Sequence, residues 1–174
     1  MTDASPPAST DEHRVGEAPL PRPDAVAVLR GLDARGWSIA TAESLTGGRV
    51  MAALVDVPGA SAHVRGGIVA YATDVKASML GVDAELLTAR GPIDPDVAVQ
   101  MAQGVRRALR ADVGLATTGV AGPEPQDDKP VGTVHIVVAT PETVVVSSLA
   151  LSGSRDEIRT QTVQRVLELA VTVL

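Results

Sequence analysis

Residues 41–48 read T-A-E-S-L-T-G-G, and the rest of the chain is organised around them. They follow a short apolar segment, residues 37–40, that is typical of a strand. Apolar residues then recur over residues 49–57 at positions i, i+3, i+4 and i+7, which is the spacing of one helical face. The stretch therefore predicts a turn that joins a strand to a helix.

Two hydroxyl side chains and two glycines lie in this turn. Glycine lets the backbone approach a ligand closely, and the first N–H groups of a helix have no partner within the helix. Such a helix end attracts a phosphate, a carboxylate or a developing oxyanion. Ser44 is therefore a candidate nucleophile, and Glu43, Thr46, Gly47 and Gly48 are candidate substrate contacts. The alternative is that Ser44 or Thr46 only caps the helix.

The composition indicates one domain with an aliphatic core. The chain has 174 residues, 45% of them hydrophobic, with one Trp, one Tyr and no Phe. A net charge of −6 and the lack of a basic stripe argue against direct binding of nucleic acid. No cysteine is present, and no apolar run approaches the roughly 20 residues of a membrane helix. We expect a cytoplasmic protein that does not enter a membrane.

The first 22 residues have the composition of a disordered tail. Five of the 12 prolines lie in the first 23 residues, mixed with Ser, Thr, Asp and Glu. The segment lacks the apolar region of a secretory signal. We therefore expect a tail over residues 1–22 and one folded domain over residues 23–174.

Hydrophobic periodicity and turn residues predict an alternating order of helices and strands in that domain. Helices are expected over residues 23–35, 49–57, 74–80, 83–90, 95–109 and 154–174, and strands over residues 37–40, 66–72, 113–118, 132–139 and 144–151. Asp94 is expected to cap one helix, and Ser154 with Glu157 has the spacing of a capping box. This order indicates an α/β layered domain whose sheet is mostly parallel and includes an antiparallel hairpin.

Tyr71 and Lys76 form a second candidate site. Tyr71 ends a predicted strand and Lys76 lies in the next helix, so both side chains can face one edge of the sheet. A lysine acts as a base only when burial or a nearby cation lowers its pKa. On residue types alone, a tyrosine at a strand end and a solvated lysine are the alternative.

A third candidate site follows the predicted strand over residues 113–118. Residues 117–123 read T-T-G-V-A-G-P, and open α/β sheets bind ligands at this end of a strand. Thr118, Gly119 and Gly122 are therefore candidate substrate contacts, with an ordinary turn as the alternative. The loop matches neither the dinucleotide-binding fingerprint nor the P-loop.

Two arginines near the start of the last helix, Arg155 and Arg159, are candidate partners for a substrate phosphate. A solvated helix face or an intramolecular ion pair is the alternative reading of both. The three histidines, His13, His63 and His135, are far apart and match no zinc motif. We therefore expect neither a metal nor another cofactor.

Taken together, these stretches resemble the CinA C-terminal domain family, the nicotinamide-nucleotide amidohydrolases. The resemblance runs from about residue 23 to the end of the chain. The matching segments are T-A-E-S-L-T-G-G at 41–48, D-V-P-G-A-S-A at 56–62, G-G-I-V-A-Y-A-T-D-V-K at 66–76, T-G-V-A-G-P at 118–123, K-P-V-G-T-V at 129–134 and G-S-R-D-E-I-R at 153–159. No single segment is decisive, but all six in this order are specific.

The resemblance implies a three-layer α/β/α sandwich with a mixed, mostly parallel sheet. It implies hydrolysis of the carboxamide of nicotinamide mononucleotide to nicotinic acid mononucleotide and ammonia, without a metal. The family's proposed catalytic Ser, Tyr and Lys match Ser44, Tyr71 and Lys76. Many members carry a further domain of the molybdopterin-binding type, and this chain resembles the stand-alone form. We expect a small-molecule nucleotide as the partner and, as for many enzymes of this size, a two-fold dimer.

The chain departs from the family pattern in three places. Leu45 stands where the family often has Cys or another small residue, residues 71–76 replace the family's Y-S-N-E-A-K, and residues 124–128 are acidic where relatives tend to be rich in glycine. Two other functions stay open. One is a non-catalytic module that binds a nucleotide or a protein in DNA uptake or recombination, as the family's competence-related name suggests. The other is an amidase for a different acyl group.

Overall fold

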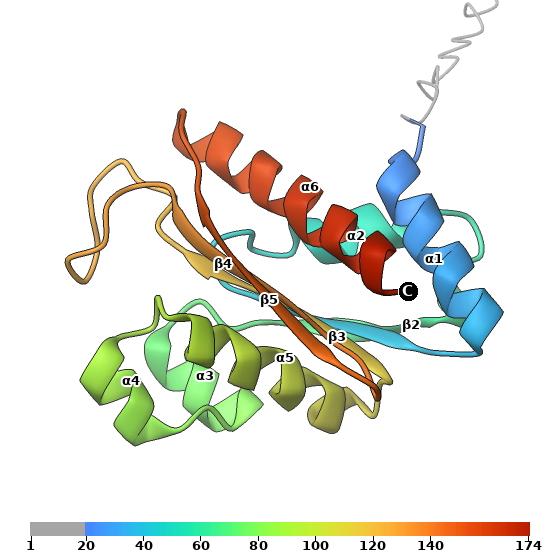
Figure 1. Ribbon diagram of the computed structural model, residues 1–174, viewed down its shortest axis with the longest axis horizontal. Helices are drawn as coiled ribbons and strands as arrows, with labels where there is room; N and C mark the ends of the chain where they lie inside the picture. Colours follow the sequence, from blue (N-terminus) through green and yellow to red (C-terminus); the bar gives the residue numbers. More distant parts are fainter. Residues whose placement is uncertain (1–19) are drawn as a thin grey trace, which may run out of the picture.

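A mixed sheet of five strands lies between two layers of helices in the computed structural model, which describes residues 20–174 (Figure 1). Of the tail expected over residues 1–22, residues 1–19 lie outside the described residues. The strands are β1 (Ile39–Glu43), β2 (Val64–Val69), β3 (Val113–Gly119), β4 (Thr133–Ala139) and β5 (Val144–Ala150). The helices are α1 (Pro23–Arg35), α2 (Arg49–Val55), α3 (Thr73–Leu80), α4 (Ala84–Arg90), α5 (Pro95–Leu109) and α6 (Arg155–Val173), with a short 3-10 turn at Ala60–Ala62.

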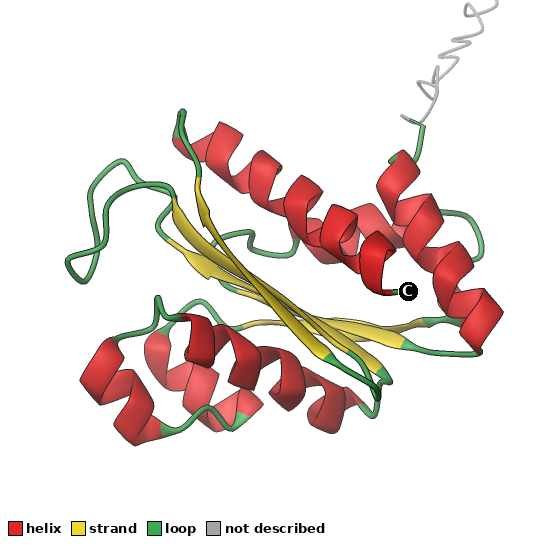
Figure 2. Cartoon of the chain, viewed as in Figure 1, coloured by secondary structure: helices red, strands yellow, loops and turns green. Residues whose placement is uncertain are grey.

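The strand order in the sheet is β2-β1-β3-β4-β5. β1 pairs in parallel with both β2 and β3, whereas β4 is antiparallel to β3 and to β5. Four strands therefore run in one direction and only β4 opposes them. Helices α1, α2 and α6 cover one face of the sheet and α3, α4 and α5 cover the other (Figure 2). The three-layer α/β/α sandwich with a mixed sheet is confirmed.

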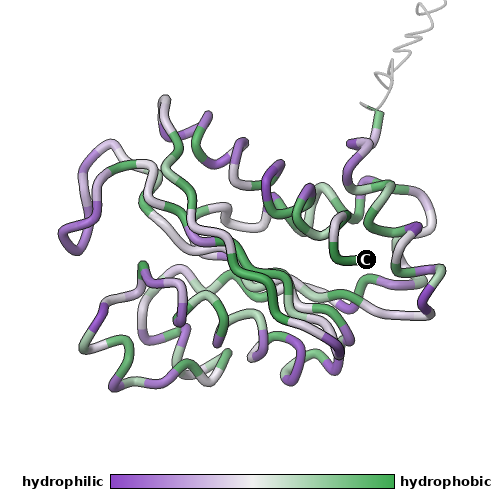
Figure 3. The backbone as a smooth tube through the Cα atoms, viewed as in Figure 1, coloured by the Kyte–Doolittle hydropathy of each residue, from purple (hydrophilic) through white to green (hydrophobic). Residues whose placement is uncertain are grey.

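The core has two parts because the central strands are buried on both faces. β1 is buried along its whole length and β3 along all but its last residue. Hydrophobic residues gather on the strands in the middle of the molecule, whereas many hydrophilic residues lie on the outer helices and loops (Figure 3). On one face, Leu54, Leu115 and Ile158 belong to the cluster under α1, α2 and α6. On the other face, Met101 and Val105 of α5 pack against the sheet. Burial of these aliphatic side chains supplies the main stabilisation of the layers.

Three elements were predicted with wrong bounds. Helix α2 ends at Val55 rather than at residue 57, β2 spans Val64–Val69 rather than residues 66–72, and the first strand runs from Ile39 to Glu43 rather than over residues 37–40. The strand continues through polar residues because β2 and β3 pair with it on both sides and because the hydroxyl of Thr41 donates to the carboxylate of Glu43 at 3.2 Å. The cap of α5 by Asp94 and the capping box at the start of α6 are confirmed.

Candidate active site

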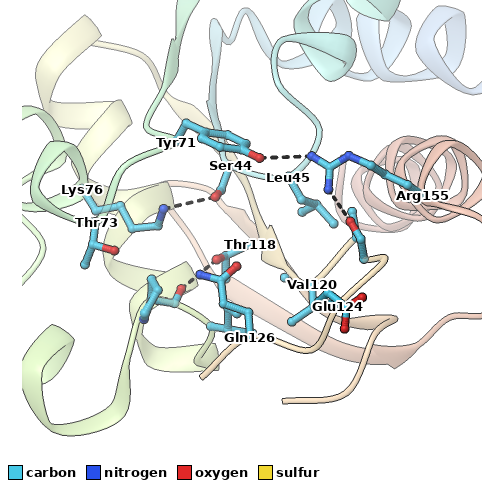
Figure 4. Close-up of a pocket in the computed structure, with 15 residues that line it drawn as sticks. Ser44, Leu45, Tyr71, Thr73, Lys76, Thr118, Val120, Glu124, Gln126 and Arg155 are labelled. Atoms are coloured by element: carbon cyan, nitrogen blue, oxygen red, sulfur yellow. Dashed lines mark hydrogen bonds between the residues drawn. The ribbon is translucent and has the colours of Figure 1, made fainter. Parts of the chain in front are cut away.

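A small pocket opens at the carboxyl ends of the three parallel strands β1, β2 and β3, where open α/β sheets usually bind ligands (Figure 4). Ser44 follows β1, Tyr71 follows β2, and residues 119–122 follow β3. Arg155, the first residue of α6, closes one side. The cavity has a volume of about 120 Å³. The topology thus brings the three candidate stretches together.

Lys76 and Ser44 are in direct contact inside this pocket. The Lys76 ammonium donates to the Ser44 hydroxyl oxygen at 3.1 Å and to the carbonyl oxygen of Ala70 at 2.7 Å. The Lys76 side chain is only 1% exposed. This burial lowers the pKa of Lys76 to about 8, because an apolar surrounding disfavours the charged form. Near pH 7 to 8, Lys76 is therefore neutral in a larger fraction of molecules than a solvated lysine would be.

The position of Lys76 depends on the close packing of α3 against α5. A β-carbon at Gly104 of α5 would lie 2.0 Å from the carbonyl oxygen of Leu80, the last residue of α3. Any larger residue at position 104 would push the end of α3 away from α5. Gly104 therefore permits the approach that carries Lys76 to Ser44.

Tyr71 lies at the rim of the pocket rather than between Ser44 and Lys76. Its side chain is 63% exposed, and its hydroxyl oxygen accepts a hydrogen bond from Arg155 at 3.1 Å. Arg155 also donates to the carbonyl oxygen of Gly122 at 2.6 Å. The two side chains thus join the loops after β2 and β3 to the start of α6 across the opening (Figure 4). The contact between Lys76 and Ser44 needs no tyrosine between them.

Glu43 occupies the helix end at which the sequence predicted a substrate anion. Its carboxylate is 1% exposed and accepts hydrogen bonds from the backbone N–H groups of Gly48, Val50 and Met51 at 2.8–3.0 Å. Gly48 has a φ of 94°, which a residue with a side chain rarely adopts. Glu43 therefore caps α2 from within the fold, and these N–H groups are not free for a ligand.

Other residues of the turn hold its shape and lie outside the pocket lining. The hydroxyls of Thr46 and Thr117 are hydrogen bonded to each other at 2.8 Å, and the Gly47 N–H donates to the Ser44 carbonyl at 3.1 Å. Arg159 donates from α6 to the carbonyl oxygens of Leu45 and Thr46 at 2.8 and 3.0 Å. The geometry thus gives Thr46, Gly47 and Arg159 structural contacts instead of the substrate contacts that the sequence predicted.

Four of the predicted substrate contacts do line the pocket, namely Thr118, Gly119, Gly122 and Arg155. The hydroxyl of Thr118 donates to the carbonyl oxygen of Pro92 at 2.7 Å, so its oxygen remains as an acceptor. The sequence did not single out several further lining residues as contacts, among them Leu45, Thr73, Ile93, Val120, Glu124 and Gln126. Leu45 and Thr73 lie beside predicted site residues, whereas Ile93 comes from the loop before α5 and carried no local signal.

Replacing Glu43 with alanine is expected to lower the free energy of unfolding by at least about 3 kcal/mol. The change leaves three N–H groups at the start of α2 without a protein acceptor, that of Val50 buried and those of Gly48 and Met51 part-buried, and an unsatisfied donor costs about 1–3 kcal/mol when it is buried. Urea unfolding followed by circular dichroism measures the loss. Glu168→Ala, which removes an exposed ion pair with Arg165, is the control and should cost less than about 1 kcal/mol. Equal losses in both variants would contradict the capping role.

Two other features of the described residues bear on the chemistry. His135 lies in β4 outside this pocket, where its Nδ1 is hydrogen bonded to the Ser148 hydroxyl at 2.8 Å and burial lowers its pKa below the usual value. Within residues 20–174, no three His, Cys, Asp or Glu side chains gather as metal ligands would. None of the helices in the same part of the chain is long and apolar enough to span a membrane.

The fold and the pocket define a class of α/β/α domain with a serine at a strand-to-helix turn and a buried lysine against it. The profile of the CinA C-terminal domain matches residues 23–174. The chain therefore belongs to the CinA C-terminal domain family, as the six segments indicated.

Individual relatives agree with this assignment. The chain is 55% identical over 147 residues to a CinA-like protein of Frankia casuarinae and 46% identical over 135 residues to a putative competence-damage inducible protein of Caldanaerobacter subterraneus. These matches cover 84% and 77% of this chain but only 34% and 33% of the relatives, so the chain spans about a third of their length.

Solved structures show the same architecture. The crystal structure of the competence/damage inducible protein CihA from Agrobacterium tumefaciens has a TM-score of 0.83 and 35% identity, covering 90% of this chain and 98% of that one. A competence-damaged protein (CinA) superfamily protein from Escherichia coli has a TM-score of 0.84 and 27% identity, covering 87% and 88%.

Proposed function

We propose that this domain hydrolyses the carboxamide of nicotinamide mononucleotide to nicotinic acid mononucleotide and ammonia. The observation that carries the proposal is the 3.1 Å contact between the Lys76 amine and the Ser44 hydroxyl in a closed-in pocket. The identity of the proposed substrate comes from the family resemblance. A non-catalytic binding module would leave this contact unexplained, because burying a lysine without a carboxylate partner opposes folding.

In the proposed reaction, the Ser44 oxygen attacks the carboxamide carbon while neutral Lys76 accepts the hydroxyl proton. The resulting Lys76 ammonium then gives a proton to the amide nitrogen, which leaves as ammonia. Water, deprotonated by Lys76, attacks the acyl-enzyme, and Lys76 returns this proton to the Ser44 oxygen as the ester bond breaks and the acid is released. Because Lys76 contacts Ser44 directly, the proposal assigns Tyr71 to the rim of the pocket, where it holds Arg155 and contacts substrate.

The oxyanion needs donors other than the filled end of α2. Among the described residues, the backbone N–H groups of Leu45 and Thr46 donate to no protein acceptor. Leu45 directly follows Ser44, so its N–H is the donor that we assign to the developing oxyanion. The sequence favoured the N–H groups at Thr46 and Gly47 as oxyanion donors. The Gly47 N–H is hydrogen bonded to the Ser44 carbonyl and is therefore not available.

The size of the cavity limits which part of the substrate it encloses. Pockets that hold a drug-sized ligand usually have about 300–1,000 Å³, whereas this one has about 120 Å³. In our proposal the cavity takes the carboxamide and its ring, and the ribose and phosphate lie across the rim beside Gly122 and Arg155. A cytoplasmic setting, a nucleotide as the partner and a two-fold dimer remain part of the proposal.

Turnover is expected to rise with pH, with its midpoint at about pH 8. Only the neutral amine can accept the Ser44 proton, and the pKa of Lys76 is lowered to about 8. About a tenth of Lys76 is then neutral at pH 7, so turnover should fall tenfold for each unit below about pH 7 and level off above pH 9. Ammonia release from pH 5.5 to 10 measures this profile. Constant turnover over that range would contradict Lys76 as the base.

The direct test of the function is ammonia release from nicotinamide mononucleotide by the purified protein without added metal. Formation of nicotinic acid mononucleotide in equal amount, followed by chromatography, would support the proposal. Failure to release ammonia at any pH between 7 and 9 would refute it and would favour a different amide or the binding module.

A further inference from the structure

Three ionisable groups besides Tyr71 line the pocket, and they lie on opposite walls. Lys76 lies beside Ser44, whereas Glu124 beside Val120 and Arg155 beside Tyr71 lie on the side of the pocket away from Lys76 (Figure 4). Glu124 belongs to the loop between β3 and β4 and is exposed. It is the only carboxylate in the pocket lining.

Glu124 and Arg155 both line the pocket, and they form no ion pair with each other. The guanidinium of Arg155 donates to the Tyr71 hydroxyl and the Gly122 carbonyl, and no carboxylate within residues 20–174 lies in ion-pair distance of it. Glu124 likewise forms no ion pair with a described residue. A pocket with a separate negative and a separate positive group complements a ligand that itself carries both charges.

The reacting serine sets the direction of such a ligand. In the proposed pose the carboxamide carbon lies at Ser44 and the ring extends away from Lys76 towards Glu124, over Leu45 and Val120, whose apolar side chains line the pocket. In nicotinamide mononucleotide the ring nitrogen is separated by one ring carbon from the carbon that bears the carboxamide, and it bears the ribose and carries a permanent positive charge. A carboxylate on that side attracts the ring, and Arg155 offsets its repulsion of the phosphate.

Resting on the proposed function, we infer that Glu124 is a specificity-determining residue that favours carboxamides on a positively charged ring. The group it recognises is the pyridinium nitrogen, and it takes no part in the bond-breaking steps. Gln126, the other polar residue of this loop in the pocket lining, carries no charge and therefore does not favour a charged ring over a neutral one.

Nicotinamide mononucleotide and its reduced, dihydro form are the probes. They have the same ribose, phosphate and carboxamide, but the reduced ring is neutral. The measured quantity is the ratio of kcat/KM for the oxidised form to that for the reduced form, together with the ratio of their dissociation constants in the Ser44→Ala background. Intrinsic differences in amide reactivity cancel when these ratios are compared between variants.

In Glu124→Gln, both ratios are expected to fall by about three- to fivefold, which is the size of an exposed charge interaction. The native preference should also shrink as sodium chloride is raised from 50 to 500 mM, because salt screens exposed charges. Constants for the reduced form should change by less than twofold.

Asp127→Asn and Asp128→Asn are matched controls. Both residues lie in the same loop, outside the pocket lining, and both changes remove one negative charge. Their φ values of 49° and 57° are in the region that asparagine also tolerates. Unchanged ratios in these variants would assign the effect to Glu124. An equal fall in all three variants, or no fall in Glu124→Gln, would overturn the inference.

The two readouts separate this inference from the proposed function. If the native protein releases no ammonia, the proposed function fails. The ratio of the dissociation constants still decides whether Glu124 distinguishes the charged ring from the neutral one. If ammonia is released but neither ratio depends on Glu124, the amidohydrolase proposal stands and the specificity role is refuted.

Discussion

Ser44→Ala is expected to reduce the turnover of nicotinamide mononucleotide by a factor on the order of a million, the loss seen when a serine hydrolase loses its nucleophile. Without the hydroxyl no acyl-enzyme forms, and Lys76 at 3.1 Å has no proton to accept. Ammonia release under saturating substrate measures the effect. The circular dichroism spectrum should remain native, since the change removes one hydrogen bond.

Ser78→Ala is the matched control for this variant. Ser78 lies in the same helix as Lys76, is exposed and is absent from the pocket lining. Its loss should change turnover by less than twofold. Retention of more than about 1% of native turnover by Ser44→Ala would show that another group is the nucleophile.

Lys76→Met is expected to be about as damaging as Ser44→Ala, because nucleophile and base act as a unit and removing either one disables both. Methionine nearly matches the length of the lysine chain but cannot accept a proton. Lys129→Met, a change of the only other lysine, is the control and should leave turnover nearly unchanged. Equal turnover in the two variants would refute the role of Lys76.

The same variant tests the burial of Lys76 without any substrate. The folded-state pKa of about 8 is below the ordinary value of 10.5, so between these values the unfolded chain binds a proton that the folded chain lacks. Raising the pH through this window therefore stabilises the fold, by about 3 kcal/mol in total, and the gain is absent below pH 8. The native unfolding free energy minus that of Lys76→Met should rise by this amount between pH 7.5 and 10.5 in urea titrations. Parallel pH curves would contradict the burial.

Much of the architecture was predictable from local patterns. Helical periodicity indicated α5 and α6, and the residues Asp94 and Ser154 marked where these helices begin. The predicted antiparallel hairpin is formed by β4 and β5. One boundary error falls on the strand before Ser44, where polar residues are typical of a turn although they are paired with strands on both sides. The others concern the end of α2 and both ends of β2.

The candidate site was less predictable, because similar residue types have different partners in space. Glu43 and Arg155 are both charged and adjoin predicted elements, yet Glu43 is enclosed as the cap of α2 while Arg155 borders the pocket. Arg159, four residues further along α6, bonds to the turn instead. No spacing in the sequence distinguishes these contacts.

The element order, the aliphatic core and the family follow from the amino-acid sequence, because periodicity, caps and ordered motifs are local properties of the chain. The contacts between distant groups follow from the folded structure: Lys76 is buried against Ser44, Glu43 fills the end of α2, and Glu124 lines the same pocket as Arg155. These groups meet because the parallel strands bring their carboxyl ends to one edge of the sheet. Desolvation then lowers the pKa of Lys76, an effect that residue type and spacing do not encode.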